Sequence, residues 1–363
     1  MLTRGFLLVS VIAVLASCCK QEASDEVMSY FKDTPSIVLA PENSVGLEQF
    51  DILVPIEIIR YKDSYIFRKG LSENYVDILT PEKAVISCVK KGRGPGELTD
   101  VGSLQLRGDT LYVFGPSQKK LLALDIPGTI ASQKQITLKE YQIENLDRKV
   151  SDQMVLPVNL QVVGEHFYGL GMFGDGSLYA ELSRDGSIVS GIPGPMLEDS
   201  KLSSLDRNSL NMDAQMTVSP DGSRIAVAYS QIAAISFGYT QPTLTNLWFK
   251  VFYQPKLWYP DRAGFMVSYE KENKTTFQDM QAFDDVVYAL YSGKNRVGDN
   301  ENRANHCDHL LVFDWNGTPL RHFELEESIA GFWVEDDTLY GISFSPAAKL
   351  YQFKPVNAVP LSK

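Results

Sequence analysis

One short phrase recurs six times along the 363-residue chain. Each copy begins with a turn of acidic residues or glycine and continues as a strand-like run. The copies are YKDSYIF, RGDTLYVF, VGEHFYGL, SPDGSRIAVAY, FDDVVYAL and EDDTLYGI. Their central residues are 46 to 62 positions apart: Ile66, Tyr112, Tyr168, Ala226, Tyr288 and Tyr340. The turn residues allow a tight reversal, and the alternating aromatic and β-branched residues suit a packed sheet face, so each copy predicts a β-hairpin.

A second hairpin follows most copies of the phrase. The segments SLYAELSRDGSIVSGI and HLLVFDWNGTPLRHFEL carry Asp-Gly and Asn-Gly at their reversals, which is the strongest short hairpin signal. Two hairpins make four strands per repeat, and repeated four-stranded sheets at this period are typical of a β-propeller. We therefore predict an all-β fold, a six-bladed β-propeller with four-stranded antiparallel blades, over residues 35–363. A pair of β-sandwiches is the alternative fold.

Closure of the ring can also be predicted. The last repeat supplies three strands before the chain ends, whereas PSIVLA, residues 35–40, has no hairpin partner nearby. An N-terminal strand paired in the last blade would close the ring and cover a sheet edge that otherwise invites aggregation. We expect residues 35–40 to be that strand. Helical inserts are predicted only at 137–152 and 197–210.

The N-terminus, MLTRGFLLVSVIAVLASCCK, combines one basic residue, an apolar run and a cysteine. The apolar run is too short to span a bilayer as a helix and is typical of a cleaved signal. The letters LASC, ending at Cys18, match the lipobox of bacterial lipoproteins, whose cysteine becomes the lipid-modified N-terminus. We predict a lipoprotein signal peptide over 1–17, lipidation at Cys18 and a polar tether over 18–34. A plain secretory signal is the alternative.

Charge and cysteine usage narrow the function classes. The chain has 34 basic and 45 acidic residues, a formal net charge of −11. Nucleic-acid binding needs Lys and Arg to neutralise phosphates, so we predict no nucleic-acid partner. Besides Cys18 and Cys19, only Cys88 and Cys307 remain. A single pair makes no disulfide framework, and we expect two buried free thiols.

The loop GRGPGELTD, which begins at Gly92, lies between two strand-like runs. Glycines permit close backbone approach, and their N–H groups can bind an anion. The loop lacks the following helix of a dinucleotide site and the Lys-Ser/Thr of a P-loop. Two interpretations remain open: a rigid corner in which Arg93 and Glu97 bond to the backbone or to each other, and a ligand-contacting loop in which both flank the mouth of the central pocket.

Other motifs carry weaker signals. Trp248 and Trp258 lie in the aromatic segment LWFKVFYQPKLWYP, where they could stack on sugar rings or fill the space between blades. The segment NHCDHLL gathers histidine, cysteine and aspartate, but adjacent strand residues face opposite sides, so we predict no metal site. Acidic pairs recur at the hairpin turns and are interpreted as turn residues. No cofactor is expected, and catalytic residues are unknown.

The lipobox, the six repeats, SPDGSRIAV and GRGPGE together resemble the TolB-like six-bladed β-propeller lipoproteins of anaerobic Gram-negative gut bacteria. SPDGSRIAV is similar to the repeat of TolB-type propellers, and a GxGPGE phrase recurs in the lipoprotein family. The resemblance implies a propeller anchored by lipid in the cell envelope, at the outer membrane, facing the periplasm or the surface. It implies little about biochemical role.

We therefore predict a ligand- or partner-binding propeller whose ligand is a glycan fragment, a peptide or an envelope protein. The candidate ligand-binding residues are Arg93, Glu97, Trp248 and Trp258. One alternative is a carbohydrate-active lyase or hydrolase, which needs carboxylates with shifted pKa values meeting in the central mouth. Another is a non-catalytic scaffold of an envelope complex, which would show an apolar patch on a side or bottom face.

Overall fold

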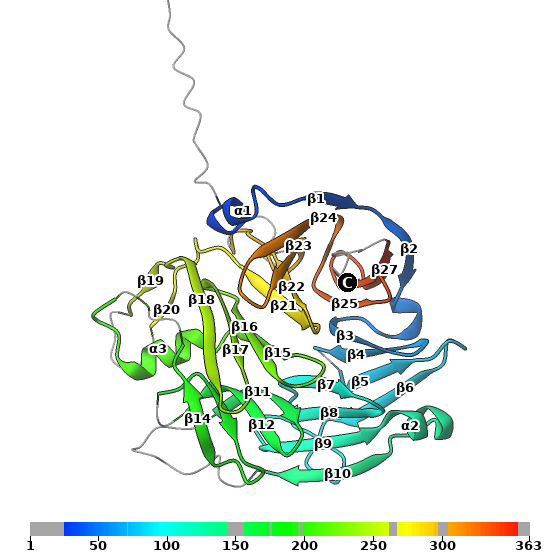
Figure 1. The fold of residues 1–363 in the computed structure, drawn as a ribbon. Helices are drawn as coiled ribbons and strands as arrows, with labels where there is room; N and C mark the ends of the chain where they lie inside the picture. Colours follow the sequence, from blue (N-terminus) through cyan, green and yellow to red (C-terminus); the bar gives the residue numbers. More distant parts are fainter. Residues whose placement is uncertain are drawn as a thin grey trace, which may run out of the picture.

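The fold is a ring of six β-sheets around a central axis (Figure 1). The computed structural model describes residues 25–70, 72–143, 156–173, 176–194, 197, 199–260, 267–296 and 304–354. The predicted six-bladed β-propeller with antiparallel blades is confirmed, and the sandwich alternative is excluded. The signal peptide and the lipidation site, predicted over 1–18, lie outside the described residues.

Blades one to four each contain four consecutive strands. Blade one consists of β3 (Pro55–Tyr61), β4 (Ser64–Lys69), β5 (Asn74–Leu79) and β6 (Val85–Lys90). Blade two consists of β7 (Ser103–Arg107), β8 (Thr110–Gly115), β9 (Lys120–Asp125) and β10 (Thr137–Gln142). Blade three consists of β11 (Leu156–Val163), β12 (His166–Met172), β13 (Tyr179–Leu182) and β14 (Ile188–Ile192). Blade four consists of β15 (Ala214–Val218), β16 (Arg224–Tyr229), β17 (Ala233–Tyr239) and β18 (Thr245–Tyr253).

The last two blades also take strands from the N-terminus. Blade five consists of β21 (Phe277–Ala282), β22 (Val286–Tyr291), β23 (Cys307–Asp314), β24 (Pro319–Ile329) and β1 (Ser36–Leu39). Blade six consists of β25 (Gly331–Glu335), β26 (Thr338–Ser343), β27 (Lys349–Phe353) and β2 (Pro41–Gly46). Outside the blades lie the ribbon strands β19 (Leu257–Trp258) and β20 (Ser268–Tyr269), the helices α1 (Glu26–Tyr30), α2 (Ile126–Ser132) and α3 (Ser204–Asn211), and a 3-10 turn, Glu48–Phe50.

The core of the protein lies between neighbouring blades. On β8, Leu111 and Val113 pack in a cluster with residues of blade one, whereas Phe114 packs in a cluster with residues of blade three. Alternate residues of a strand point to opposite faces, so each blade needs apolar side chains at successive positions of its middle strands. This requirement explains why the recurring phrase in the sequence is a nearly continuous apolar run.

An N-terminal strand closes the ring, as predicted, but the residues differ from those expected. Strand β2 pairs antiparallel with β27 and supplies the fourth strand of blade six. Residues 36–39 instead form β1, which pairs in parallel with β24 as a fifth strand of blade five. The segment PENSVG of β2 is mostly exposed, because an outermost strand packs little apolar surface. Its polar sequence therefore carried no strand signal.

The tether predicted over 18–34 is wrong for its last ten residues. Residues 25–34 dock on the propeller, where Val27 and Phe31 are buried among side chains of blades four and five. The Asp25 carboxylate caps α1 by accepting hydrogen bonds from the backbone N–H groups of the helix start. The same carboxylate accepts a hydrogen bond from the Tyr291 hydroxyl (2.6 Å) and pairs with Lys274 (3.0 Å).

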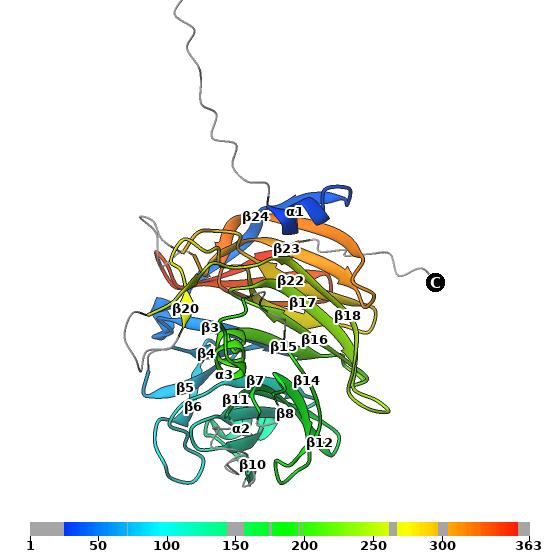
Figure 2. The same ribbon diagram turned by 90° about the vertical axis from the view of Figure 1, so that its left-hand side faces the viewer.

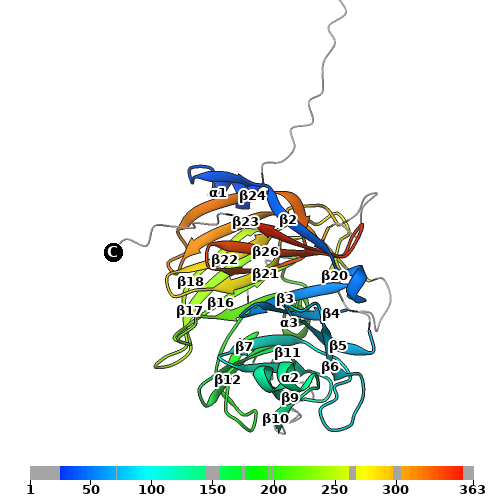
Figure 3. The ribbon, with the colours of Figure 1, turned by 90° about the vertical axis from the view of Figure 1, so that its right-hand side faces the viewer.

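The N-terminal clasp, Asp25–Gly46, therefore contacts three consecutive blades. Helix α1 packs on blades four and five, β1 extends blade five and β2 completes blade six. Figures 1, 2 and 3 show the clasp along the outer rim of the ring, beside β24 and β27. The clasp joins the beginning of the chain to its last blades.

The predicted helical inserts are confirmed only in part. Helix α3 lies in the predicted segment 197–210 except for its last residue, Asn211. It begins with a capping box of Ser203 and Asp206. In the segment 137–152, residues 137–142 form the outer strand β10, and residues 144–152 lie outside the described part of the chain. Strand β10 is largely exposed, and its residues are mostly polar. A solvent-exposed helix has a similar composition, which is why the sequence predicted a helix here. No described helix is long and apolar enough to cross a membrane.

The predicted free thiols are confirmed. Cys88 and Cys307 are both free and both buried. Burial raises the pKa of the Cys88 thiol to about 12 and raises the pKa of the Cys307 thiol as well. Neither thiol is ionised near neutral pH, so both act as small apolar core residues.

Side chains of two opposite blades hold the inner strands of the ring together. Gln105 of β7 donates to the carbonyl of Val162 on β11 (3.3 Å) and accepts from its N–H (2.6 Å). Gln281 of β21 forms the same pair of bonds with Val334 on β25 (3.1 and 2.6 Å). These bonds satisfy backbone groups that have no neighbouring strand to pair with. Blades two and five are thus fastened to the blades that follow them.

The clasp generates a first prediction. Asp25→Ala removes the cap of α1 and leaves the buried hydroxyl of Tyr291 without its acceptor. We expect the free energy of unfolding in urea to fall by about 2–3 kcal/mol, from the lost cap and the unsatisfied hydroxyl. Adding Tyr291→Phe should cost less in the Asp25→Ala background than in the wild type. An Asp25→Ala protein with unchanged stability would show that the clasp is not fastened at Asp25.

The inner-strand bonds generate a second prediction. Gln281→Ala leaves the N–H and the carbonyl of Val334 without these partners, which should lower the free energy of unfolding by about 1–3 kcal/mol. The matched control is Gln215→Ala on β15, because the side chain of Gln215 makes no hydrogen bond with any described residue. We expect that control to change stability by less than about 0.5 kcal/mol. Equal losses in the two variants would contradict the assignment.

Candidate functional site

A cavity of about 560 Å³ lies at the centre of the ring. The first strand of every blade contributes to its wall: β3, β7, β11, β15, β21 and β25. The volume falls within the range of about 300–1,000 Å³ that is usual for small-molecule sites. The cavity is therefore the main candidate for a functional site.

The wall is built from equivalent positions of the six repeats. The central residue of each repeat pairs across its hairpin with one inner-strand residue: Ile59, Gln105, Gln161, Thr217, Gln281 or Trp333. Two residues earlier on the same strands lie Glu57, Ser103, Asn159, Gln215, Asp279 and Gly331. All of these residues except Gly331 line the cavity. The repeat thus brings six pairs of positions, most of them polar, to one place.

Some of these polar side chains form hydrogen bonds with the backbone of the next blade. Besides the bonds of Gln105 and Gln281, the Ser103 hydroxyl bonds to both the N–H (3.0 Å) and the carbonyl (3.1 Å) of Leu160. These side chains face neighbouring backbone as much as the cavity. Their first role is structural.

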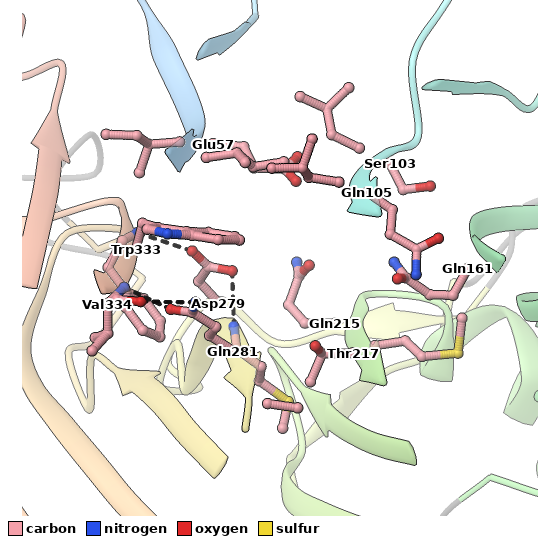
Figure 4. Close-up of a pocket in the computed structure, with 18 of the residues that line it drawn as sticks. Glu57, Ser103, Gln105, Gln161, Gln215, Thr217, Asp279, Gln281, Trp333 and Val334 are labelled. Atoms are coloured by element: carbon pink, nitrogen blue, oxygen red, sulfur yellow. Dashed lines mark hydrogen bonds between the residues drawn. The ribbon is translucent and has the colours of Figure 1, made fainter. Parts of the chain in front are cut away.

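Other side chains in the wall keep unused hydrogen-bonding groups. Gln161 and Asn159 bond to each other (3.3 Å), and only 7% and 9% of these residues is exposed. The other end of each amide makes no hydrogen bond with a described residue. Gln215 and Thr217 on β15 have no such bond at all, and Figure 4 shows both at the cavity wall. Four polar side chains therefore remain available within a largely buried space.

Two carboxylates, Glu57 and Asp279, also line the cavity. Glu57 on β3 forms an ion pair with Arg68 on β4, with 2.7 Å between Oε2 and Nε. Arg68 also donates to the Val101 carbonyl (3.3 Å), which orients the guanidinium. Figure 4 shows Glu57 across the cavity from Gln215 and Thr217.

Asp279 on β21 is held by backbone donors. One carboxylate oxygen accepts from the N–H of Met280 (2.8 Å) and the other from the N–H of Phe332 (3.0 Å). Burial raises the pKa of Asp279 to about 7; the Phe332 N–H opposes this rise, and the nearby Glu57 carboxylate adds to it. Asp279 therefore changes charge close to neutral pH.

An aromatic ring completes this side of the wall. Figure 4 shows the Trp333 indole beside Asp279 and Glu57. The indole nitrogen of Trp333 is buried and makes no hydrogen bond with a described residue. The ring supplies a flat apolar surface between the carboxylates.

A second guanidinium crosses one end of the cavity. Arg107, at the end of β7, donates to the Pro220 carbonyl (2.6 Å) and the Ser219 carbonyl (3.3 Å) in the turn after β15. These bonds connect blade two with blade four. The Ser-Pro-Asp-Gly turn that stands out in the sequence thus helps to cover the cavity.

The GRGPGE loop lies elsewhere. Glu97 accepts a hydrogen bond from the Gly94 N–H (2.9 Å), and Lys120 on β9 donates to the carbonyls of Gly94 and Glu97. A Cβ atom at Gly92 would lie 2.0 Å from Glu97 Oε2, so a side chain there would displace the Glu97 carboxylate from this position. Arg93 and Glu97 do not line the central cavity. The geometry is that of a rigid corner, and ligand contact by these two residues stays a prediction.

The two tryptophan candidates are separated. Trp248 stacks on Phe237 (5.4 Å between ring centroids) and packs against the cluster between blades four and five. Trp258 is 49% exposed on the ribbon strand β19. Neither lines the central cavity, and a ligand role for either stays a prediction.

The histidines near Cys307 do not converge on one point. His306 accepts from the Phe344 N–H (3.3 Å), whereas His309 bonds to His322 (3.0 Å). Over the described ranges, no group of three or more His, Cys, Asp or Glu side chains is arranged to hold a metal ion.

Sequence reasoning missed the residues of the cavity wall, although a signal was present. In five of the six repeats the second residue of the wall pair lies seven positions before the repeat centre: Ile59, Gln105, Gln161, Gln281 and Trp333. Three of these five are glutamine, which is unusual inside an otherwise apolar strand. A glutamine seven positions before the repeat centre therefore marks the inner strands of blades two, three and five.

Comparison with known proteins agrees with this architecture. A crystal structure of a DUF4221 family member from Bacteroides vulgatus is similar over 87% of this chain and 97% of that chain, with a TM-score of 0.55 and 10% sequence identity. A candidate exported protein from Bacteroides fragilis matches over 88% of this chain and 99% of its own, with a TM-score of 0.49 and 7% identity. At such identities the likeness concerns the fold alone.

Family assignment rests on the sequence. No curated protein matches the chain. The family model described as TolB-like 6-blade propeller-like matches residues 52–337, which include the inner strands of all six blades. The chain belongs to this TolB-like six-bladed propeller family.

Proposed function

We propose that this protein is an exported binding protein that holds a small, hydroxyl-rich molecule, such as a glycan fragment, in its central cavity. The observation that carries the proposal is the set of unused polar groups on Asn159, Gln161, Gln215 and Thr217. Polar groups in a confined cavity that have no protein partner can bond to a ligand that enters it and so fix its orientation. Hydroxyl groups both donate and accept, so they suit amide ends of either polarity.

The shape of the site supports the same ligand class. The Trp333 ring offers a flat apolar face beside the polar groups, and a sugar ring has one apolar face and a polar rim. Peptides and envelope proteins fit less well, because the unused groups lie inside the ring and not on an outer face.

Export and anchoring form the second part of the proposal. The apolar N-terminal run and the LASC motif support a lipoprotein signal with lipid attached at Cys18, at the outer membrane. The clasp begins at Asp25 on the outer rim, beside blades four and five and away from the cavity lining. An anchor that precedes the clasp would leave the cavity free to receive a ligand.

A second function is favoured by one observation. Asp279, with its pKa near 7, and Glu57 lie in the same cavity. Two carboxyl groups, one of them with a raised pKa, are used for glycoside hydrolysis. The cavity can therefore serve a carbohydrate-active hydrolase in place of a binder, and formation of shorter products distinguishes the two.

The binding proposal predicts a ligand-dependent rise in melting temperature. A ligand of the native state stabilises it by mass action, so a neutral glycan that fits should raise the melting temperature of residues 25–363. Gln215→Ala and Thr217→Val should abolish that rise. Gln142→Ala, on the exposed strand β10, is the matched control and should retain it.

Three results would contradict this proposal or indicate a different function. A rise that survives in both cavity variants would place the site elsewhere. A complete lack of response to a broad set of neutral glycans would contradict the proposed ligand class. Release of shorter sugars during incubation, lost in Asp279→Asn, would identify the hydrolase.

Lipid anchoring has its own test. Cells that express the full chain should incorporate labelled fatty acid into the protein, and the protein should fractionate with the outer membrane. Cys18→Ala should remove both the label and the membrane association, whereas Cys19→Ala should retain them. An unlabelled wild-type protein released from the cell would indicate a plain secretory signal.

A further inference from the structure

Asp279 faces the cavity without a cation to balance its charge. The two hydrogen bonds to its carboxylate come from the backbone N–H groups of Met280 and Phe332, and no Lys, Arg or His among the described residues forms an ion pair with it. Backbone donors hold the carboxylate in place but carry no net charge. A partly buried carboxylate in this situation is stabilised when a cation approaches it.

The rest of the wall does not supply that cation. The cavity is lined by four carboxylates, Glu57, Asp279, Glu335 and Asp336, and two guanidiniums, Arg68 and Arg107. Arg68 is paired with Glu57, and Arg107 bonds to backbone carbonyls at the end of the cavity. Glu335 forms an ion pair with Arg60 (3.3 Å). Among the described charges of the lining, none is therefore left to pair with Asp279.

We propose that the ligand of the central cavity carries a protonated amine that lies against the Asp279 carboxylate, as in an amino sugar. This inference rests on the proposed function and names the ligand class more narrowly. The ammonium would lie against Asp279, on the side of the cavity with Trp333. The ligand hydroxyls would face Gln215 and Thr217 on the neighbouring strand β15 (Figure 4).

The surroundings of Asp279 suit an ammonium group. An ammonium has three donors and no acceptor, so it needs oxygen atoms at several positions. The carboxylate of Asp279 and the side-chain amide of Gln215 lie next to each other in Figure 4, and the Glu57 carboxylate lies on the facing wall. The Trp333 ring adds a face that attracts a cation. A metal ion fits less well, because no group of three ligating side chains is present in the described part of the chain.

The proposal has a definite pH dependence. The charged groups that face Asp279 are Glu57 on β3 and Arg68 on β4, and its backbone donor on β25, Phe332, is not titratable. Burial raises the pKa of Asp279 to about 7, so at pH 5.5 the carboxyl is mostly protonated and at pH 7.5 mostly ionised. An ammonium favours the ionised form. Its affinity should therefore rise between these values, with release of a proton from Asp279 below pH 7.

A matched pair of probes tests the amine. Glucose and 6-amino-6-deoxyglucose differ only by a hydroxyl and an alkyl ammonium, which stays protonated throughout this pH range. In calorimetric titrations of residues 25–363 at pH 7.5, we expect the amino sugar to bind at least tenfold more tightly than glucose. The preference should shrink towards pH 5.5. Titrations at pH 6.5 in two buffers of different ionisation enthalpy should show proton release.

Variants separate the roles of the residues. Asp279→Asn should abolish the preference for the amino sugar while glucose binding persists, and its melting curve reports any loss of folding. Glu57→Gln should weaken the preference less, because Asp279 remains. Gln142→Ala should behave as the wild type.

The contrary outcomes are distinct. Equal or tighter binding of glucose, or an affinity for the amino sugar that rises as the pH falls, overturns the amine and makes Asp279 a neutral hydrogen-bond donor. In that case Gln215-dependent glucose binding leaves the proposed function standing. Absence of binding for both sugars at every pH overturns the inference and the proposed glycan site together.

Discussion

The structure depends on one pair of strands: β2, from the beginning of the chain, pairs antiparallel with β27, near its end. Without this strand, blade six would have three strands, and only side-chain contacts between blades one and six, such as the packing of Phe67 with Tyr340, would join the two ends of the ring. The clasp extends this closure by placing α1 and β1 on blades four and five. Because the clasp joins distant parts of the chain, the inner strands are held around a cavity of fixed size.

Within the closed ring, equivalent positions have divided into two roles. The side-chain amides of Gln105 and Gln281 form hydrogen bonds with the backbone of the next blade and so fix the spacing of the inner strands. Gln161, at the equivalent position on blade three, bonds with its side chain only to Asn159 among the described residues and lines the cavity. The structural role and the proposed binding role thus use one repeated position. The structural role needs two well-placed backbone groups, and the binding role needs their absence.

The charge distribution in the cavity follows the same logic. Arg68 neutralises Glu57, whereas Asp279 receives only backbone dipoles. Burial then raises the pKa of Asp279 to about 7, so its charge responds to small changes of pH or to an arriving cation. A site of this kind distinguishes ligands by charge as well as by shape. The exposed candidates from the sequence, Arg93 and Trp258, have no comparable setting.

The sequence by itself determined the number of blades, the strand content and the buried free cysteines, because turn residues and period-two alternation are local properties. It also held the spacing that marks the inner strands, which a comparison of the six repeats reveals. Only the tertiary structure decided that β2 and not β1 completes blade six, that residues 25–34 dock on the rim, and that Asp279 and Glu57 meet in one cavity. These facts rest on pairings between residues far apart in the chain, and an exposed outer strand or a lone carboxylate leaves no local pattern from which such a partner can be read.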